Sequence, residues 1–228
     1  MKEQTNRRTA LLSLLLLAAF WLRLFRLGDQ PVWYDEVYSI AVARHSAAEV
    51  AGWIYRDNHP ALYWFLLYPV VHLLGDTEFV GRFPSALLGT MTVALLYTAG
   101  KRMLGSRRVG LLAALWLAVS PIHVVYSQEA RMYALLTLCG LASTLFLYQG
   151  MRRGGVVNWV MFGVMAAATA HSHNYGLLLV GAQDCWALAH ILVRRNRRSM
   201  LGLGLGQLVF AALYAPMVPA LLAQLQMH

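Results

Sequence analysis

Long apolar segments separated by short polar ones make up almost the whole chain. A helix of about 20 apolar residues is long enough to cross the hydrocarbon core of a bilayer, and a helix satisfies its own backbone hydrogen bonds there. The pattern therefore predicts an all-α polytopic membrane protein with about seven transmembrane helices, folded as a single module over residues 1–228. The predicted spans are residues 9–27, 79–103, 109–126, 131–148, 156–170, 177–193 and 201–222.

The most polar stretch, residues 28–78, lies between the first two predicted spans and contains a shorter apolar run, residues 61–74. At about 14 residues this run is short for a span. If it crossed the membrane, the next basic loop would move to the outer side, against the usual distribution of positive charge. We therefore predict that residues 28–78 form an outer-face loop with interfacial helices.

Composition supports a membrane chain. The sequence is 59% hydrophobic and 13% charged, with a mean hydropathy of +0.52, which is too apolar for an ordinary soluble domain. The first apolar run could also be a secretory signal peptide. It is followed by Arg23 and Arg26 rather than by a small-residue cleavage site, which favours a span that stays in the membrane.

The net charge of +9 is gathered in clusters between the apolar runs. Because basic loops stay in the cytoplasm, we predict a multi-pass protein of the plasma (inner) membrane with a cytoplasmic N-terminus. The clusters do not form one basic patch, so the charge does not indicate nucleic-acid binding. The clusters are Lys2, Arg7 and Arg8; Lys101, Arg102, Arg107 and Arg108; Arg152 and Arg153; and Arg194, Arg195, Arg197 and Arg198.

An acidic pair, Asp35 and Glu36, follows the first span and is flanked by Trp33 and Tyr34. A carboxylate among aromatic rings at the edge of a low-dielectric region can have a raised pKa, which suits a general base acting on a hydroxyl. The alternatives are a solvated loop acid and a charge that stabilises a helix N-terminus.

Glu129 and Arg131 lie between the ends of two predicted spans at the outer face. The planar guanidinium of Arg131 can bind a phosphate through two hydrogen bonds. Alternatively, the two residues pair with each other or extend to the lipid headgroups. Arg82, near the start of the second span, could join Arg131 around an anion or could be an ordinary interfacial anchor.

Two histidine segments complete the candidates. His59, next to Pro60, could donate to a phosphate or transfer a proton, or could simply support the start of a helix. The run from His171 to Tyr175, which includes His173 and Asn174, is a polar break at the outer end of the fifth span. Histidines two residues apart point to different faces of a helix, so the run predicts a cavity wall and no metal site.

Four segments in this order resemble the N-terminal part of bacterial family 39 glycosyltransferases. These are membrane enzymes of the GT-C superfamily, related to protein O-mannosyltransferases and to the lipid A aminoarabinose transferase. The segments are Trp-Tyr-Asp-Glu at 33–36, Asn-His-Pro-Ala-Leu-Tyr-Trp at 58–64, Gly-Asp-Thr-Glu-Phe-Val-Gly-Arg-Phe-Pro-Ser-Ala at 75–86, and Ser-Gln-Glu-Ala-Arg-Met-Tyr-Ala-Leu at 127–135.

The resemblance implies a GT-C-like fold and transfer of a sugar from a polyprenyl-phosphate donor to a hydroxyl acceptor at the outer face, with inversion. It implies that Asp35 is the catalytic base, that Glu36 supports it, and that Arg131, Arg82 and His59 lie near the donor phosphate. We expect Glu129, Tyr133, His173 and Asn174 to line the cavity.

The implied acceptor is a lipid, glycan or protein hydroxyl, and the other partners are membrane lipids. We expect no required cofactor, and the need for a divalent cation is left as an open alternative. Two departures from the family pattern are Ala61, where a second proline is common, and an end at His228, before the further spans of the usual family chain. A second subunit would then supply the C-terminal part.

Two other functions remain open. The chain could be a non-catalytic subunit that binds the lipid carrier, or a truncated fragment of a split transferase; both would keep the arginines without depending on Asp35. A transporter would require ionisable groups near the middle of the membrane, and Asp184 is the main example in this sequence.

Overall fold

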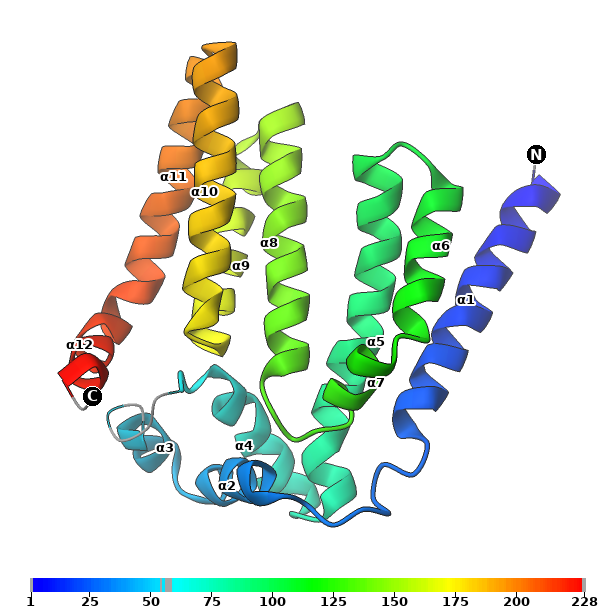
Figure 1. Cartoon of the computed structure of the whole chain (residues 1–228), viewed down its shortest axis with the longest axis vertical. Helices are drawn as coiled ribbons and strands as arrows, with labels where there is room; N and C mark the ends of the chain where they lie inside the picture. The colour runs from blue at the N-terminus through cyan, green and yellow to red at the C-terminus, as the bar shows by residue number, and fades with distance from the viewer. Residues whose placement is uncertain (1, 54, 56–58, 227–228) are drawn as a thin grey trace.

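The computed structural model describes residues 2–53, 55 and 59–226 (Figure 1). These residues form helices and no strand. The elements are α1 (Lys2–Leu24), α2 (Tyr34–Arg44), α3 (Ala47–Trp53), α4 (Leu62–Leu74), α5 (Glu78–Met103), α6 (Arg107–Ala118), α7 (Pro121–Tyr126), α8 (Tyr133–Arg153), α9 (Val156–Ser172), α10 (Tyr175–Arg194), α11 (Arg197–Tyr214), the 3₁₀ turn η1 (Ala215–Met217) and α12 (Val218–Gln226).

The long helices run up and down, and α2, α3 and α4 lie at one end of them (Figure 1). The N-terminus and the α5–α6, α8–α9 and α10–α11 connections all lie at the opposite end (Figure 1). We call that opposite end the basic end, because these connections carry the arginine clusters, and we call the end with α2–α4 the site end. The charge pattern of the sequence is thus separated in space, whereas the side of the membrane that each end faces stays a prediction.

Four helical segments are long and apolar enough to cross a membrane: α5, α8, α10, and residues Arg197–Ala223, which run from α11 into α12. The apolar part of α1, Thr9–Leu24, and α9 are shorter. The predicted all-α polytopic membrane fold is confirmed, and the total of seven spans stays a prediction.

Residues 109–126, predicted as one span, form two helices, α6 and α7, and the crossing itself stays a prediction. Pro121 has no N–H to continue the helix, and its ring forces the preceding residue into an extended conformation. Ser120 accordingly has a ψ of 118°. The exposed carbonyl groups at the end of α6 accept hydrogen bonds from Arg23, at 3.3 Å for Ala118 and 3.4 Å for Leu117.

The apolar run predicted as an interfacial helix does form a helix, α4. Its buried face carries Tyr63, Trp64, Leu67 and Val71, which join the core that also contains side chains from α2 and α8. This helix is therefore packed on the bundle through its own apolar residues.

Close packing of α9 against α11 depends on a glycine. A Cβ atom at Gly163 would overlap the carbonyl oxygen of Gly206 and would lie 2.8 Å from the Cβ of Val209. Small residues of this kind allow helix backbones to approach closely in a bilayer.

We predict that Gly163→Ala destabilises the fold by about 1–3 kcal/mol, because neither backbone can move without separating the helices. The control is Gly204→Ala in α11, where an added Cβ meets nothing within 4 Å. The measurement is the free energy of unfolding of each variant in detergent micelles. Equal stability of the two variants would show that this contact is not tight.

Candidate functional site

Glu36 is fully buried in the first turn of α2 and accepts hydrogen bonds from three directions. Nε and Nη2 of Arg82 each donate to its carboxylate at 2.7 Å, which makes a bidentate ion pair. The backbone N–H of Ala130 donates at 2.8 Å and that of Trp33 at 3.3 Å. Burial raises the pKa of Glu36, but the hydrogen bonds from Arg82 and Ala130 outweigh burial and hold this pKa below its usual range. Glu36 is therefore ionised.

Arg82 uses its remaining N–H groups on the chain that enters α2. Nη1 donates to the carbonyl groups of Leu27, at 3.0 Å, and Gln30, at 2.8 Å, and Nη2 donates to that of Pro31 at 3.3 Å. Together with the pair to Glu36, these bonds occupy all the guanidinium donors. The geometry thus gives Arg82 a role in holding the outer loop, which differs from the phosphate contact that the sequence predicted.

Asp35 and Arg131 face each other beside this buried pair. Nη2 of Arg131 lies 3.5 Å from Oδ2 of Asp35, and Nη1 donates at 3.4 Å to both the Asp35 carbonyl and Ser39 Oγ. The Arg131 side chain is 4% exposed and that of Asp35 35% exposed. Nε of Arg131 has no hydrogen-bond partner in the described part of the chain. These contacts are long, so the guanidinium keeps donors for another anion.

The backbone around Arg131 is fixed by α4 and α5. Ser85 Oγ donates to the Arg131 carbonyl at 3.2 Å, and Tyr63 OH lies 2.9 Å from Ser85 Oγ. All three residues are buried. Since Ala130 is bonded to Glu36, two adjacent residues of the α7–α8 connection are held by different helices.

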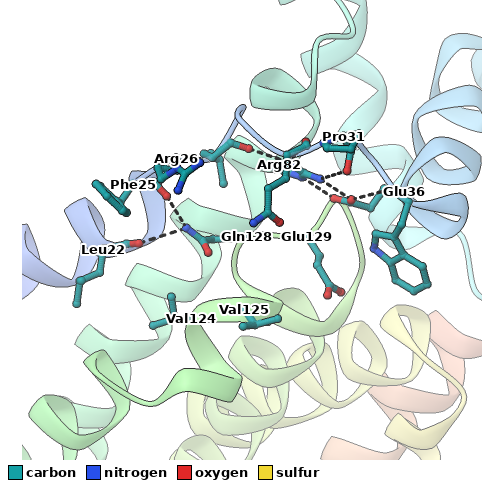
Figure 2. Close-up of a pocket in the computed structure, with 13 residues that line it drawn as sticks. Leu22, Phe25, Arg26, Pro31, Glu36, Arg82, Val124, Val125, Gln128 and Glu129 are labelled. Atoms are coloured by element: carbon teal, nitrogen blue, oxygen red, sulfur yellow. Dashed lines mark hydrogen bonds and ion pairs between the residues drawn. The ribbon is translucent and has the colours of Figure 1, made fainter.

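Glu129 lines a cavity of about 570 Å³ together with Glu36 and Arg82, and its side chain points away from that pair (Figure 2). Its Oε2 atom is buried and has no hydrogen-bond partner within the described residues. Burial, and then the negative charge of Glu36, raises the pKa of Glu129 above its usual range. The ends of α1 and α7 form an apolar wall of this cavity, which includes Leu22, Phe25, Val124 and Val125.

Three of the other predicted residues meet in an aromatic cluster. The ring of His173 lies 5.5 Å from that of His59 and 6.4 Å from that of Tyr133, measured between centroids. Burial, and then the charges of His59 and Arg131, lowers the pKa of His173, so this ring is neutral at pH 7. The adjacent Asn174 precedes α10. Asn58, part of the sequence motif, lies outside the described residues.

An anchor on α1 was not predicted from the sequence. Arg23 is fully buried, and its Nη2 atom donates to Nδ1 of His123 at 2.8 Å. Gln128 Nε2 donates to the carbonyl groups of Leu22 and Phe25, at 3.3 and 2.9 Å, and so joins α1 to the segment before Glu129. An arginine at the end of an apolar run was the available signal, because a charge there needs partners. It had been used only as an argument against signal-peptide cleavage.

Among the described residues no group of three or more histidine, cysteine, aspartate or glutamate side chains could hold a metal ion. The predicted site residues instead surround one cation, the guanidinium of Arg131, with carboxylates and aromatic rings. Arg131 lies beside Asp35, and its charge also acts on Glu129 and His173.

We predict that Glu36→Gln and Arg82→Gln each destabilise the fold by about 3–5 kcal/mol, because each leaves a buried charge without its partner. The double variant should cost clearly less than the sum. Asp29→Asn, at the exposed pair with Arg26, is the control and should cost little. Unfolding free energies in detergent give all four values, and additive costs would contradict the coupling.

The same pair predicts a pH dependence. Because the pKa of Glu36 is lower in the folded than in the unfolded chain, its stabilising contribution is fully present above about pH 4.3 and is lost as the pH falls through the folded pKa. Unfolding measured from pH 7 downward should show an acid-sensitive component that Glu36→Gln lacks. An identical acid limb in both proteins would contradict this prediction.

Comparisons with known proteins bear on this arrangement. Residues 58–219 match the profile of a family described as dolichyl-phosphate-mannose-protein mannosyltransferase. The matched range contains His59, Arg82 and Arg131. Asp35 and Glu36 precede it. A search of curated proteins found no match.

A solved structure has the same fold: the S. cerevisiae protein O-mannosyltransferase Pmt1-Pmt2 complex bound to the sugar donor, with a TM-score of 0.72 and 20% sequence identity. The match covers 94% of this chain and 34% of the yeast chain, so the chain spans about a third of the length of that relative. The predicted GT-C-like fold is confirmed.

Proposed function

This chain belongs to the dolichyl-phosphate-mannose-protein mannosyltransferase family, and we propose that it transfers a sugar from a polyprenyl-phosphate donor to a hydroxyl acceptor. The observation that carries the proposal is the pairing of Arg131, a buried cation with unused donors, with the partly exposed carboxylate of Asp35. A cation for the leaving phosphate and a base for the acceptor would thus be adjacent.

In the proposed reaction Asp35 accepts the proton of the acceptor hydroxyl. The oxygen of that hydroxyl attacks the anomeric carbon of the donor sugar. The bond between that carbon and the phosphate oxygen breaks, and the phosphate leaves with the electron pair. Attack from the side opposite the phosphate inverts the anomeric centre. Arg131 would stabilise the charge that develops on the phosphate, because a fixed donor in a site of low dielectric needs no reorganisation.

The buried pair would act through these two residues. Glu36 follows Asp35 in α2 and accepts a hydrogen bond from the N–H of Ala130, the residue before Arg131. Because Arg82 holds Glu36 in place, the pair sets the distance between Asp35 and Arg131. We therefore propose Glu36 and Arg82 as positioning residues. His59, Tyr133, His173 and Asn174 would form a wall for the donor, and Glu129 would line the adjoining cavity.

The proposed site faces outward in the plasma (inner) membrane, with the N-terminus in the cytoplasm. The argument is the separation of the site end from the arginine clusters of the basic end, which the positive-inside rule assigns to the cytoplasm. The acceptor would be a lipid, glycan or protein hydroxyl. Because the relative forms a Pmt1-Pmt2 complex, we also propose a second subunit here.

The decisive test is transfer of labelled sugar from polyprenyl-phosphate carriers in membranes that contain the chain, with and without neighbouring gene products. We predict that Asp35→Asn lowers the transfer rate by about 10²–10⁴-fold, because the base is lost while the shape is kept, and that it leaves donor binding intact. Asp29→Asn, an acidic residue of the same loop with an exposed partner, is the matched control.

Arg131→Gln should weaken both donor binding and the transfer rate, because its charge serves the bound phosphate and the developing charge. Transfer that survives Asp35→Asn would contradict the proposed base. Donor binding without transfer in the wild type would favour a non-catalytic subunit that binds the lipid carrier.

A further inference from the structure

A second cavity, of about 150 Å³, lies at the basic end, far from the proposed catalytic residues. It lies where the α8–α9 connection meets the α10–α11 connection; these two turns lie side by side because α9 packs closely along α11. Arg152, Arg153 and Arg198 line it together with Asn196, Ser199 and the indole of Trp159. The cavity is large enough for a phosphate group and too small for a folded peptide.

Among the residues that the structure describes, these three arginines have no acidic partner. Every ion pair that the structure gives among its described residues lies at or near the site end. Arg152 donates to Tyr148 OH at 2.8 Å, and the guanidinium of Arg198 lies against Gly154, 3.5 Å from where a Cβ atom would stand. Three like charges around one small space repel one another unless an anion lies between them.

Two helix N-termini add to this positive potential. The 17-residue helix α9 follows Gly155, which provides no side-chain cap. The 18-residue helix α11 follows Asn196, whose Oδ1 accepts from the N–H of Ser199 at 3.1 Å. The positive ends of both helix dipoles therefore lie at the cavity that the arginines line, and helix N-termini of this kind bind phosphate readily.

The N-terminal parts of α9 and α11, the two helices that begin at the cavity, expose apolar side chains. Val156 and Val157, in the first turn of α9, are 67% and 72% exposed, and Leu201 in α11 is 78% exposed. A free phosphate ion would gain nothing from these side chains, whereas acyl chains attached to the phosphate would cover them. The arrangement of charge above and hydrocarbon below is that of a phospholipid.

From these observations we propose that the cavity between the α8–α9 and α10–α11 connections is a binding site for the phosphodiester of an anionic phospholipid. Arg153 and Arg198 hold the phosphate, and the acyl chains lie along α9 and α11. Basic pockets between transmembrane helices are a general means of binding anionic headgroups. This site is independent of the sugar-transfer reaction, and either proposal can fail without the other.

The experiment measures lipid binding to the full chain by native mass spectrometry, with phosphatidylglycerol and phosphatidylcholine as probes. Arg153→Gln together with Arg198→Gln should weaken phosphatidylglycerol binding by roughly tenfold. Arg107→Gln together with Arg108→Gln is the matched control, since it removes the same charge from another loop of the same end; it should change binding less than about twofold. Arg198→Lys tests the planar fork and should lie between wild type and the double variant.

Two further measurements make the result unambiguous. Melting temperatures of all variants without added lipid establish that they are folded, and the rise caused by phosphatidylglycerol should be lost only in the Arg153 and Arg198 variant. Equal losses in both double variants would overturn the site in favour of diffuse charge attraction. An equal rise with inorganic phosphate alone, or equal binding of phosphatidylcholine, would overturn the lipid assignment.

Discussion

The buried ion pair between Glu36 and Arg82 is the interaction on which the site end depends. Neither charge could remain where it is without the other, because an uncompensated buried charge costs several kcal/mol. The pair is bidentate. The remaining N–H groups of Arg82 donate to backbone carbonyl groups of residues 27–31, and the carboxylate of Glu36 also accepts from the N–H groups of Trp33 and Ala130. Three segments far apart in sequence, residues 27–36, Arg82 and Ala130, are thereby fixed to one another. The partly exposed Asp35 and the buried Arg131 receive their separation from this arrangement.

Polarity of the whole molecule follows from the way the helices alternate. Each pair of neighbouring long helices returns the chain to the same end, so the arginine clusters of three connections collect at the basic end (Figure 1). Most of the described acidic residues lie in or beside α2–α4 and the α7–α8 connection, at the site end. Both proposed phosphate sites use cations, but in different ways. Arg131 is buried next to a carboxylate, whereas Arg153 and Arg198 are exposed and have no acidic partner among the described residues. The first arrangement suits a reaction and the second suits a structural lipid.

Much of this fold could be predicted from hydrophobic length and charge alone. The apolar runs predicted the helices, including α4 within residues 61–74. The break between α6 and α7 was missed because hydropathy does not register the missing N–H of Pro121, although the proline itself was visible. The motif residues indicated which side chains would gather at the site. They did not indicate that all N–H groups of Arg82 donate to Glu36 and to the backbone of residues 27–31. Nor did they indicate that Arg23 is buried against His123, because such pairing depends on how separate helices meet.

The most direct test of this account is an experimental structure of the protein with a polyprenyl-phosphate sugar bound. The account predicts that the phosphate contacts Arg131, that Asp35 faces the anomeric carbon on the opposite side, and that the Glu36–Arg82 pair is intact. A phosphate bound to Arg82, with Glu36 displaced from it, would contradict the central claim, because the pair would then be part of the donor site and not the frame that holds it.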